Sequence, residues 1–244
     1  MVKRQKIRKT MILMSFLLFP ITLYYFSPYL IVMGASEGII TGSAVVFILM
    51  FIFSLLFGRG FCGWLCPAGG LQECCSMVVD KKAKGGVLNW IKFFIWIPWI
   101  ASIITMFLLA GGIKRTDFFY QTQYGISTIS IQAYVVYYGV IALVTILALT
   151  LGRRSFCHYV CWMAPFMIIG AKIKNIFKYP SLHLEGEKDK CISCSICNKK
   201  CPMSLDVNSM VKKEKMHNLE CILCGECVDS CPKKAIKITF STDK

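Results

Sequence analysis

The strongest constraint on this sequence is a run of four cysteines that occurs twice near the C-terminus. Residues 191–202 read CISCSICNKKCP and residues 221–232 read CILCGECVDSCP, so both follow the pattern CxxCxxCxxxCP. Bacterial proteins use this spacing to ligate two [4Fe-4S] clusters, and the fourth cysteine of each run ligates the other run's cluster. The first predicted ligand set is therefore Cys191, Cys194, Cys197 and Cys231, and the second is Cys221, Cys224, Cys227 and Cys201.

Two other uses of these cysteines fit the pattern less well. Zinc usually draws its ligands from two separated CxxC or Cys/His pairs, whereas here a third cysteine follows at once and neither run contains a histidine. Disulfides are rare where cysteines face a reducing cytoplasm. Residues 190–240 instead resemble the two-cluster bacterial ferredoxins, which implies a small α+β fold with paired hairpins and one-electron transfer.

The composition of the chain indicates contact with lipid. Of the 244 residues, 56% are hydrophobic, and the mean hydropathy is +0.58, whereas soluble domains are about 45–50% apolar. The formal net charge of +15 alone would suggest a nucleic-acid partner. Only Lys114 and Arg115 of the 28 basic residues fall in a segment expected outside, so the positive-inside rule explains the excess and no nucleic-acid binding is expected.

Four apolar segments have the length of membrane spans. They are predicted as helices over Met11–Val32 with a kink at Pro20, Ile40–Phe57, Ile91–Ala110 and Ile131–Leu151. Five basic residues precede the first helix, so both termini are predicted in the cytoplasm, with Glu37 and Asp117 outside. A fifth span over residues 155–171 is rejected, because the lysines that follow it would have to cross the membrane.

The predicted fold class is therefore an α-helical integral membrane protein with four transmembrane helices plus a small α+β ferredoxin-like domain. The membrane domain is expected over residues 1–178, a linker over 179–189 and the cytoplasmic domain over 190–244. The expected location is the inner, or plasma, membrane.

The membrane domain contains an internal repeat. The second and fourth predicted spans both end in Gly-Arg, Phe-Cys and a CxxxC pair, which gives the cysteines Cys62, Cys66, Cys157 and Cys161. CxxxC places two thiols one helical turn apart on one face, so the four could converge at the inner membrane surface. They could hold a third iron-sulfur cluster, bind copper, act as a dithiol pair, or simply pack as small apolar residues. Cys74 and Cys75 have no counterpart in the second half and are interpreted as packing residues.

On these features the whole chain resembles the NapH-like polyferredoxins, membrane subunits proposed as quinol dehydrogenases. The resemblance is carried by the four spans, the two GR…CxxxC elements and the C-terminal two-cluster domain. It implies a quinone pool or a membrane-bound redox subunit as one partner. The usual element of this family is CxxxCP twice; Cys66-Pro67 matches it, whereas Trp162 follows Cys161 and the proline comes at Pro165.

Other redox cofactors find no ligands in the sequence. The three histidines, His158, His183 and His217, lie outside the predicted spans, and there is no CxxCH motif, so haem is not expected. A bound nucleotide is not expected either. The predicted function is electron transfer between the membrane and a soluble cytoplasmic partner. The alternatives are a copper-reducing assembly factor and an iron-sulfur redox sensor or scaffold. The soluble partner is expected to be acidic, because Lys199, Lys200, Lys233 and Lys234 adjoin the ligand loops.

Overall fold

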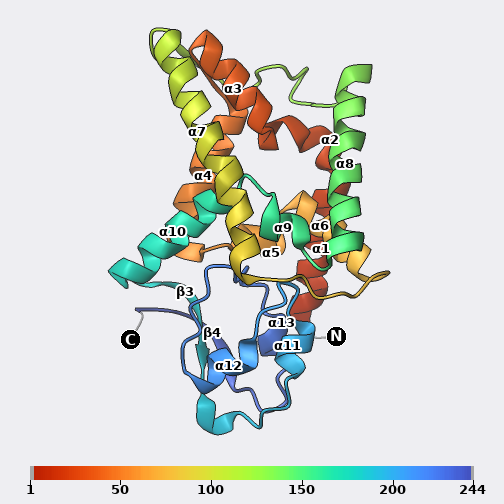
Figure 1. Ribbon diagram of the computed structural model, residues 1–244, viewed down its shortest axis with the longest axis vertical. Helices are drawn as coiled ribbons and strands as arrows, with labels where there is room; N and C mark the ends of the chain where they lie inside the picture. Colours follow the sequence, from red (N-terminus) through yellow and green to blue (C-terminus); the bar gives the residue numbers. More distant parts are fainter. Residues whose placement is uncertain (1–2, 243–244) are drawn as a thin grey trace.

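The computed structural model describes residues 3–242 and has two parts that are stacked along its long axis. Long helices form the upper part of Figure 1, and a small unit of short helices and two strands forms the lower part. Short helices lie at the level between them. Both ends of the described chain lie in the lower half of the molecule.

The first predicted span is not one helix. The segment forms α1 (Lys3–Leu17), α2 (Phe19–Thr22), the 3₁₀-helix η1 (Leu23–Phe26) and α3 (Pro28–Glu37). Two prolines account for the breaks, since Pro20 lies in the first turn of α2 and Pro28 begins α3, where a proline is tolerated because its missing N–H is not needed. α1 and the Phe19–Phe26 segment meet at a bend of 59°, close to Pro20, where a kink was predicted.

The second predicted span begins as a strand. β1 (Ile39–Thr41) pairs in parallel with β2 (Arg115–Asp117), and only then does α4 (Gly42–Phe57) begin. The side chain of Thr41 caps α4 by accepting a hydrogen bond from the Ala44 N–H. The pairing brings the segments after Glu37 and before Asp117 to the same end of the molecule, where both were predicted to lie.

The other two predicted spans are continuous helices. They are α7 (Ile91–Leu109), which follows the 3₁₀-helix η2 (Gly86–Trp90), and α8 (Ile131–Leu151). Among the described residues, Gly86–Leu109 and Ile131–Leu151 are long and apolar enough to cross a membrane. The bent pair from Lys3 to Phe26 could form a third span, and α4, with 16 residues, is a shorter apolar helix. Many large apolar side chains on α7 and α8 are exposed, which fits contact with lipid.

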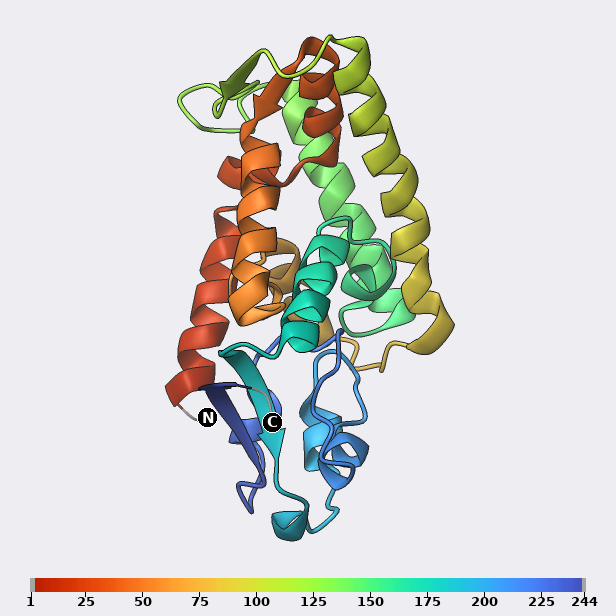
Figure 2. The ribbon, with the colours of Figure 1, turned by 90° about the vertical axis from the view of Figure 1, so that its left-hand side faces the viewer.

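The repeated element folds the same way in both halves. α4 is followed by the short helix α5 (Gly60–Trp64) and by α6 (Pro67–Ser76), and α8 by the short α9 (Ser155–Tyr159) and by α10 (Ala164–Phe177). Pro67 and Pro165 both lie in the first turn of the later helix, so the late proline of the second half keeps the same local geometry. The packing is reciprocal, because α6 lies on α8 and α10 lies on α4 (Figure 2).

The lower part is held together by the first and last of its elements. β3 (Ser181–Gly186) and β4 (Ile236–Ser241) form an antiparallel pair, with η3 (Lys188–Lys190), α11 (Ile196–Lys200), α12 (Val207–Lys212) and α13 (Glu226–Asp229) between them. The described residues thus contain one strand pair here, rather than the predicted paired hairpins. The segment expected as a linker contains β3. One hydrophobic core runs without interruption from Phe47 and Met50 of α4 into Ile222 and Ile236 below.

Candidate metal centres

Two cavities in the lower part separate the eight cysteines into the two predicted sets. One is lined by Cys191, Cys194, Cys197 and Cys231, and the other by Cys201, Cys221, Cys224 and Cys227. Each set takes three cysteines from one run and the fourth from the other, as the spacing predicts. The two cavities have the same volume, about 20 Å³ each, as two equal clusters would require.

The backbone around both cavities repeats the same unusual conformation. Ser193 and Leu223 are equivalent positions of the two runs, and both have a positive φ. The same holds for Ser195 and Gly225, and for Ser204 and Lys234 beyond the fourth cysteines. A residue other than glycine in this left-handed region costs roughly 1–2 kcal/mol, and such strain is typically retained at functional sites. Its repetition at matched positions fits two loops that each wrap a bound group.

A metal that binds these thiols must displace their protons. Burial raises the pKa of Cys221 to about 11 and that of Cys224 to about 12, so without a metal these groups are neutral at physiological pH. Metal binding displaces the proton because the ligand is the thiolate. No three Cys, His, Asp or Glu side chains among residues 3–242 lie close enough to hold a single metal ion. A four-iron cube keeps its ligands further apart, which agrees with the two cysteine-lined cavities.

The four cysteines of the repeat come together between α5 and α9. Cys62, Cys66, Cys157 and Cys161 are all buried and belong to the same core. Burial and then the charges of Cys62, Cys157 and Cys161 raise the pKa of Cys66, so all four thiols lie within electrostatic range of one another. Their convergence was expected if the two repeats pack together. The predicted placement of each pair on one helical face is wrong, because α5 and α9 end before Cys66 and Cys161. Cys75 lies on the face of α6 that meets α8, close to Thr145, as the packing interpretation expects.

Two buried arginines accompany these thiols and are also related by the repeat. Arg59 precedes α5 and Arg154 precedes α9, and each is 1% exposed. Burial alone would lower the pKa of Arg59, but Glu220, Cys62 and Cys157 raise it overall. Arg154 donates to the Cys62 carbonyl at 2.8 Å. Arg59 Nε, Arg59 Nη2 and Arg154 Nε are buried without a hydrogen-bond partner, so the site keeps donors available for an anionic occupant.

Polar and sulfur contacts complete the surroundings of the thiols. Gln72 Nε2 donates to Cys157 Sγ at 3.2 Å, and its Oε1 accepts from the Phe156 N–H at 3.0 Å. Met167 Sδ lies 3.8 Å from Cys62 Sγ. Burial lowers the pKa of His158 to about 4, so this ring is neutral at physiological pH. The sequence offers no pattern that would single out Gln72 or Met167. The repeated Gly-Arg draws attention to Arg59 but, in the second half, to Arg153 rather than to the buried Arg154.

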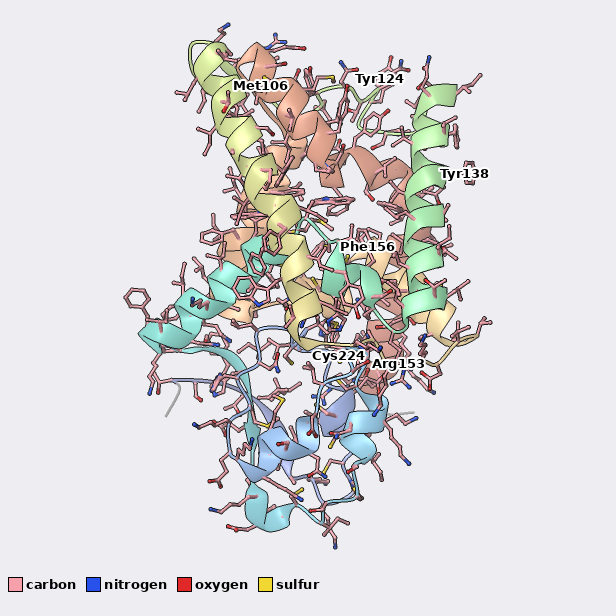
Figure 3. All side chains as sticks on the ribbon, in the orientation of Figure 1. Met106, Tyr124, Tyr138, Arg153, Phe156 and Cys224 are labelled. Atoms are coloured by element: carbon pink, nitrogen blue, oxygen red, sulfur yellow. The ribbon has the colours of Figure 1, made fainter. Side chains whose placement is uncertain are left out.

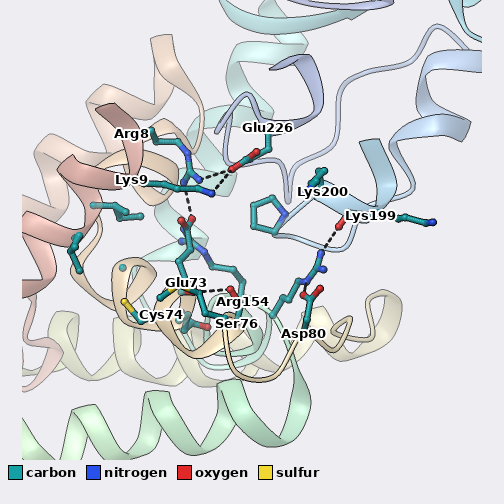
Figure 4. Close-up of a pocket in the computed structure, with 17 residues that line it drawn as sticks. Arg8, Lys9, Glu73, Cys74, Ser76, Asp80, Arg154, Lys199, Lys200 and Glu226 are labelled. Carbon is teal, nitrogen blue, oxygen red and sulfur yellow. Dashed lines mark hydrogen bonds and ion pairs between the residues drawn. The ribbon is translucent and has the colours of Figure 1, made fainter. Parts of the chain in front are cut away.

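A groove of about 410 Å³ opens beside the thiols, between α1, α6 and the lower part (Figure 4). Its walls carry six basic and three acidic residues together with the apolar Ile12, Leu13 and Met77. Glu73 accepts from Arg8 at 2.7 Å and from Arg154 at 2.5 Å, as the dashed lines in Figure 4 indicate. Gln72 also lines the groove, so the groove reaches the residue that contacts Cys157.

Two of the four lysines assigned to partner docking turn out to face this groove. Lys199 and Lys200 line it, and the carbonyl of Lys199 accepts from Arg153 at 2.6 Å. Lys233 lines the cavity of Cys191, Cys194, Cys197 and Cys231, and Lys233 and Lys234 are exposed. All four lysines are exposed, so docking of a soluble partner at them stays a prediction.

Comparison with protein families matches both parts of the chain. A family described as "4Fe-4S binding domain" matches twice, over residues 40–84 and 132–180, which are the two copies of the repeat. A family described as "4Fe-4S dicluster domain" matches residues 190–236, the segment with both cysteine runs. No solved structure matches the chain.

Similar proteins extend the comparison over most of the sequence. A protein of Methanocaldococcus jannaschii described as uncharacterized is 27% identical over 88% of this chain and 80% of its own length. The putative electron transport protein YccM of Escherichia coli is 26% identical over 88% of this chain, which spans 60% of YccM. The ferredoxin-type protein NapH of Haemophilus influenzae is 23% identical over 80% of this chain, which spans 66% of NapH. The chain is therefore an iron-sulfur electron-transport protein of the NapH-like polyferredoxin family.

Proposed function

We propose that this protein spans the membrane four times and carries electrons between a membrane redox partner and a soluble partner in the cytoplasm. The observation that carries the proposal is the arrangement of its cysteines. Two cavities, each lined by four cysteines, lie below a third group of four buried cysteines at the inner ends of α4 and α8. Iron-sulfur clusters bound there would accept and donate one electron at a time.

The residues of the chain would bind and tune two clusters in the lower part. Cys191, Cys194, Cys197 and Cys231 would ligate one, and Cys201, Cys221, Cys224 and Cys227 the other. The description of the matching family as a dicluster domain supports this number. Carbonyl and thiol groups at these loops are shielded from water by Met203, Val211 and Ile222, which are each 1% exposed.

The four membrane cysteines are proposed as the exchange site toward the membrane. Arg59 and Arg154 supply positive charge and unpartnered N–H groups there, which would offset the charge of thiolates that bind a cluster. The groove beside them combines an apolar wall at Ile12 and Leu13 with the charged pair of Glu73 and Arg154. A quinol, the membrane partner that the family resemblance suggests, has the matching combination of an apolar tail and a polar headgroup.

Copper reduction is the second candidate function, and one contact favours it. Met167 Sδ and Cys62 Sγ lie 3.8 Å apart, and thioether and thiolate are the soft ligands that Cu(I) prefers. In that case the lower clusters would supply the electron, and the repeat would bind the copper ion as substrate.

Replacing Cys62 and Cys157 by serine tests the proposal. The double variant should retain the low-temperature EPR signals of both lower clusters after chemical reduction, because those sites keep all eight ligands. It should lose reduction of these clusters by a quinol or their oxidation by a quinone. A Cys75→Ser variant is the control, since Cys75 packs toward Thr145 of α8 and has no counterpart in the second copy of the repeat. Unchanged quinone coupling in the double variant would return Cys62 and Cys157 to the role of packing residues, whereas selective loss of copper reduction would favour the second candidate.

A further inference from the structure

One of the two cysteine-lined cavities is joined closely to the first copy of the repeat. The loop 219–225, which carries Cys221 and Cys224, lies directly on α5. Trp64 Nε1 donates to the Leu223 carbonyl at 3.1 Å, and Gln5 Nε2 of α1 donates to the Cys224 carbonyl at 3.0 Å. A Cβ atom on Gly63 would clash with the carbonyl oxygen of Ile222. Since Gly63 follows Cys62, the closest approach of the loop occurs beside a membrane cysteine.

The remaining ligand of the same cavity is joined to the second copy of the repeat. Cys201 begins a turn whose Met203 carbonyl lies 3.1 Å from His158 Nε2, next to Cys157. Arg153 Nη1 donates to the Cys201 carbonyl at 3.4 Å, and Figure 3 shows Arg153 and Cys224 at this junction. Both segments that line this cavity with cysteines therefore contact the membrane part, one through each repeat.

Buried ion pairs fix this arrangement. Glu220, which precedes Cys221, accepts from Arg59 and from Lys92, both at 2.5 Å, and the two basic side chains are fully buried. Glu226 pairs with Arg8 at 3.2 Å, and Asp229 pairs with Arg4 at 2.7 Å. Breaking such a pair leaves a buried charge uncompensated, which is strongly unfavourable. The lower part is thus held in one register against the membrane cysteines.

The other cavity differs in exposure. Both cavities are lined only by residues of the lower part, but three cysteines of the first, Cys201, Cys224 and Cys227, are buried, against one of the other, Cys197. Cys194 is exposed, and Ile192 beside it is 58% exposed. Lys190 and Lys233, which also line this cavity, are exposed as well.

We propose that the two sites act in a fixed order. The site of Cys201, Cys221, Cys224 and Cys227 is proximal and exchanges electrons with the membrane cysteines. The site of Cys191, Cys194, Cys197 and Cys231 is distal and exchanges them with an acidic, soluble one-electron carrier that docks around Cys194. This order rests on the proposed function. Each exchange reduces one site and oxidises its neighbour by one electron, with no bond made and no proton moved.

The charge distribution identifies the class of carrier. The segment 190–244 has ten basic and six acidic residues, and three of the acids, Glu220, Glu226 and Asp229, are paired with the membrane part. The face around the distal site carries Lys233 and also Lys190, which pairs with Glu187, and it exposes the apolar Ile192 beside Cys194. An acidic protein surface with a small apolar contact complements such a face, and the lysines would steer its approach.

Relaxation by a soluble paramagnetic ion tests the order without any measurement of turnover. The full chain is purified in detergent and reduced, and EPR power saturation is recorded with and without a dysprosium chelate. Cys194→Ser and Cys224→Ser variants assign the two signals. We expect the chelate to relax the distal signal several-fold more than the proximal one. Equal relaxation of both signals would overturn the order. Absence of iron from the purified protein would instead contradict the proposed function.

A pair of alanine variants tests the contact itself. Gly63→Ala should force the 219–225 loop off α5 and raise the relaxation of the proximal signal. Gly60→Ala is the matched control on the same helix, because a Cβ there makes only ordinary contacts at 3.7 Å with Phe53 and Phe57. The proposal fails if both variants behave like the wild type.

Docking is tested with reduced flavodoxin, an acidic protein that donates single electrons. Lys233→Glu should slow reduction of the distal site several-fold at low ionic strength, whereas Lys172→Glu on α10 should leave the rate unchanged. Equal rates in both variants would exclude docking at the distal site.

Discussion

Glu220 is a single acidic residue on which two buried cations depend. Arg59 and Lys92 are fully buried, and both place a nitrogen 2.5 Å from its carboxylate. Removal of the carboxylate would leave both charges in an apolar surrounding, and such a loss costs about 3–5 kcal/mol. The side chain therefore matters far more for the junction of the two parts than its 14% exposure suggests.

We expect Glu220→Ala to lower the free energy of unfolding by about 3–5 kcal/mol and to release the lower part to limited proteolysis. Glu214→Ala is the control, because Glu214 and its partner Lys188 are both about half exposed, and such a pair contributes about 1 kcal/mol or less. Thermal unfolding and the rate of tryptic cleavage near Tyr179 measure the effect. Similar losses in both variants would show that Glu220 does not hold the junction.

A second prediction concerns two residues of the cysteine loops that have a positive φ. Substitution should raise the stability of the protein at one of them and lower it at the other. Lys234 has φ 49° and is exposed, whereas Gly225 has φ 74°. Lys234→Gly should stabilise the protein by about 1 kcal/mol because it removes strain, and Gly225→Ala should destabilise it by a similar amount because it adds strain. Chemical denaturation followed by cluster absorbance measures both changes. Shifts of the same sign would contradict the strained backbone.

At the scale of elements, the sequence predicted the long straight helices and missed the interruptions. α8 begins and ends where its apolar run does, and α7 ends one residue before the predicted Ala110. Both runs are strongly apolar and have the length of a membrane span, so their helices can be predicted from local sequence. The first span broke at Pro20 and Pro28, and whether a proline kinks or ends a helix depends on neighbours that the sequence does not place.

Part of the candidate site could be predicted from the sequence for the same reason. Ligand spacing depends on local sequence, so the two cysteine sets could be predicted, whereas the convergence of the CxxxC pairs depends on how the two repeats pack. The β1–β2 pairing joins residues more than 70 positions apart, and the pairing of Arg59 with Glu220 joins residues 161 apart. Neither leaves a local pattern. The assignment of Lys199, Lys200, Lys233 and Lys234 to a partner surface stays a prediction, since all four are exposed.

The packing of α10 on α4 depends on one glycine. A Cβ atom on Gly170 would overlap with Ser54 Oγ and approach the Phe51 carbonyl at 3.2 Å. Gly170→Ala should therefore destabilise the protein by about 1–3 kcal/mol through overpacking. Gly139→Ala on α8 is the control, since a Cβ there meets no atom within 4 Å, and alanine favours a helix over glycine. Melting temperatures in detergent should fall for the first variant only; an equal fall in both would contradict close packing at Gly170.

The membrane topology makes a further element-scale prediction. Alkaline phosphatase, which is active only outside, should be active when fused after Glu37 or Asp117 and inactive when fused after Lys82, Lys174 or Lys244. The reason is the basic clustering at the inner ends of the helices, and the β1–β2 pairing places the two outer positions at one end. Activity of the fusion at Lys244 would contradict the topology.

At the scale of the whole molecule, the metal content of the purified protein distinguishes between two clusters, three clusters and zinc. Iron and acid-labile sulfide should each reach about eight per chain if two clusters occupy the lower part, because each contains four of either atom. About twelve would mean that the membrane cysteines hold a third cluster. Chelation of the iron should unfold the lower part first, since its strained loops lose their bound groups. Stoichiometric zinc in place of iron would contradict the cluster assignment.

The reciprocal packing of α6 on α8 and of α10 on α4 has a consequence for how such a chain can arise. Each half gives its last helix to the other half, as two exchanged subunits of a symmetric dimer do. A half-length ancestor would have built this fold only as a pair, with the thiols gathered about the two-fold axis. Duplication and fusion would then have allowed the two halves to diverge. In the first half Arg59 now pairs with Glu220, and in the second half His158 now contacts the Met203 carbonyl. The two-cluster part, which has no such symmetry, could thus bind to a membrane part built from two related halves.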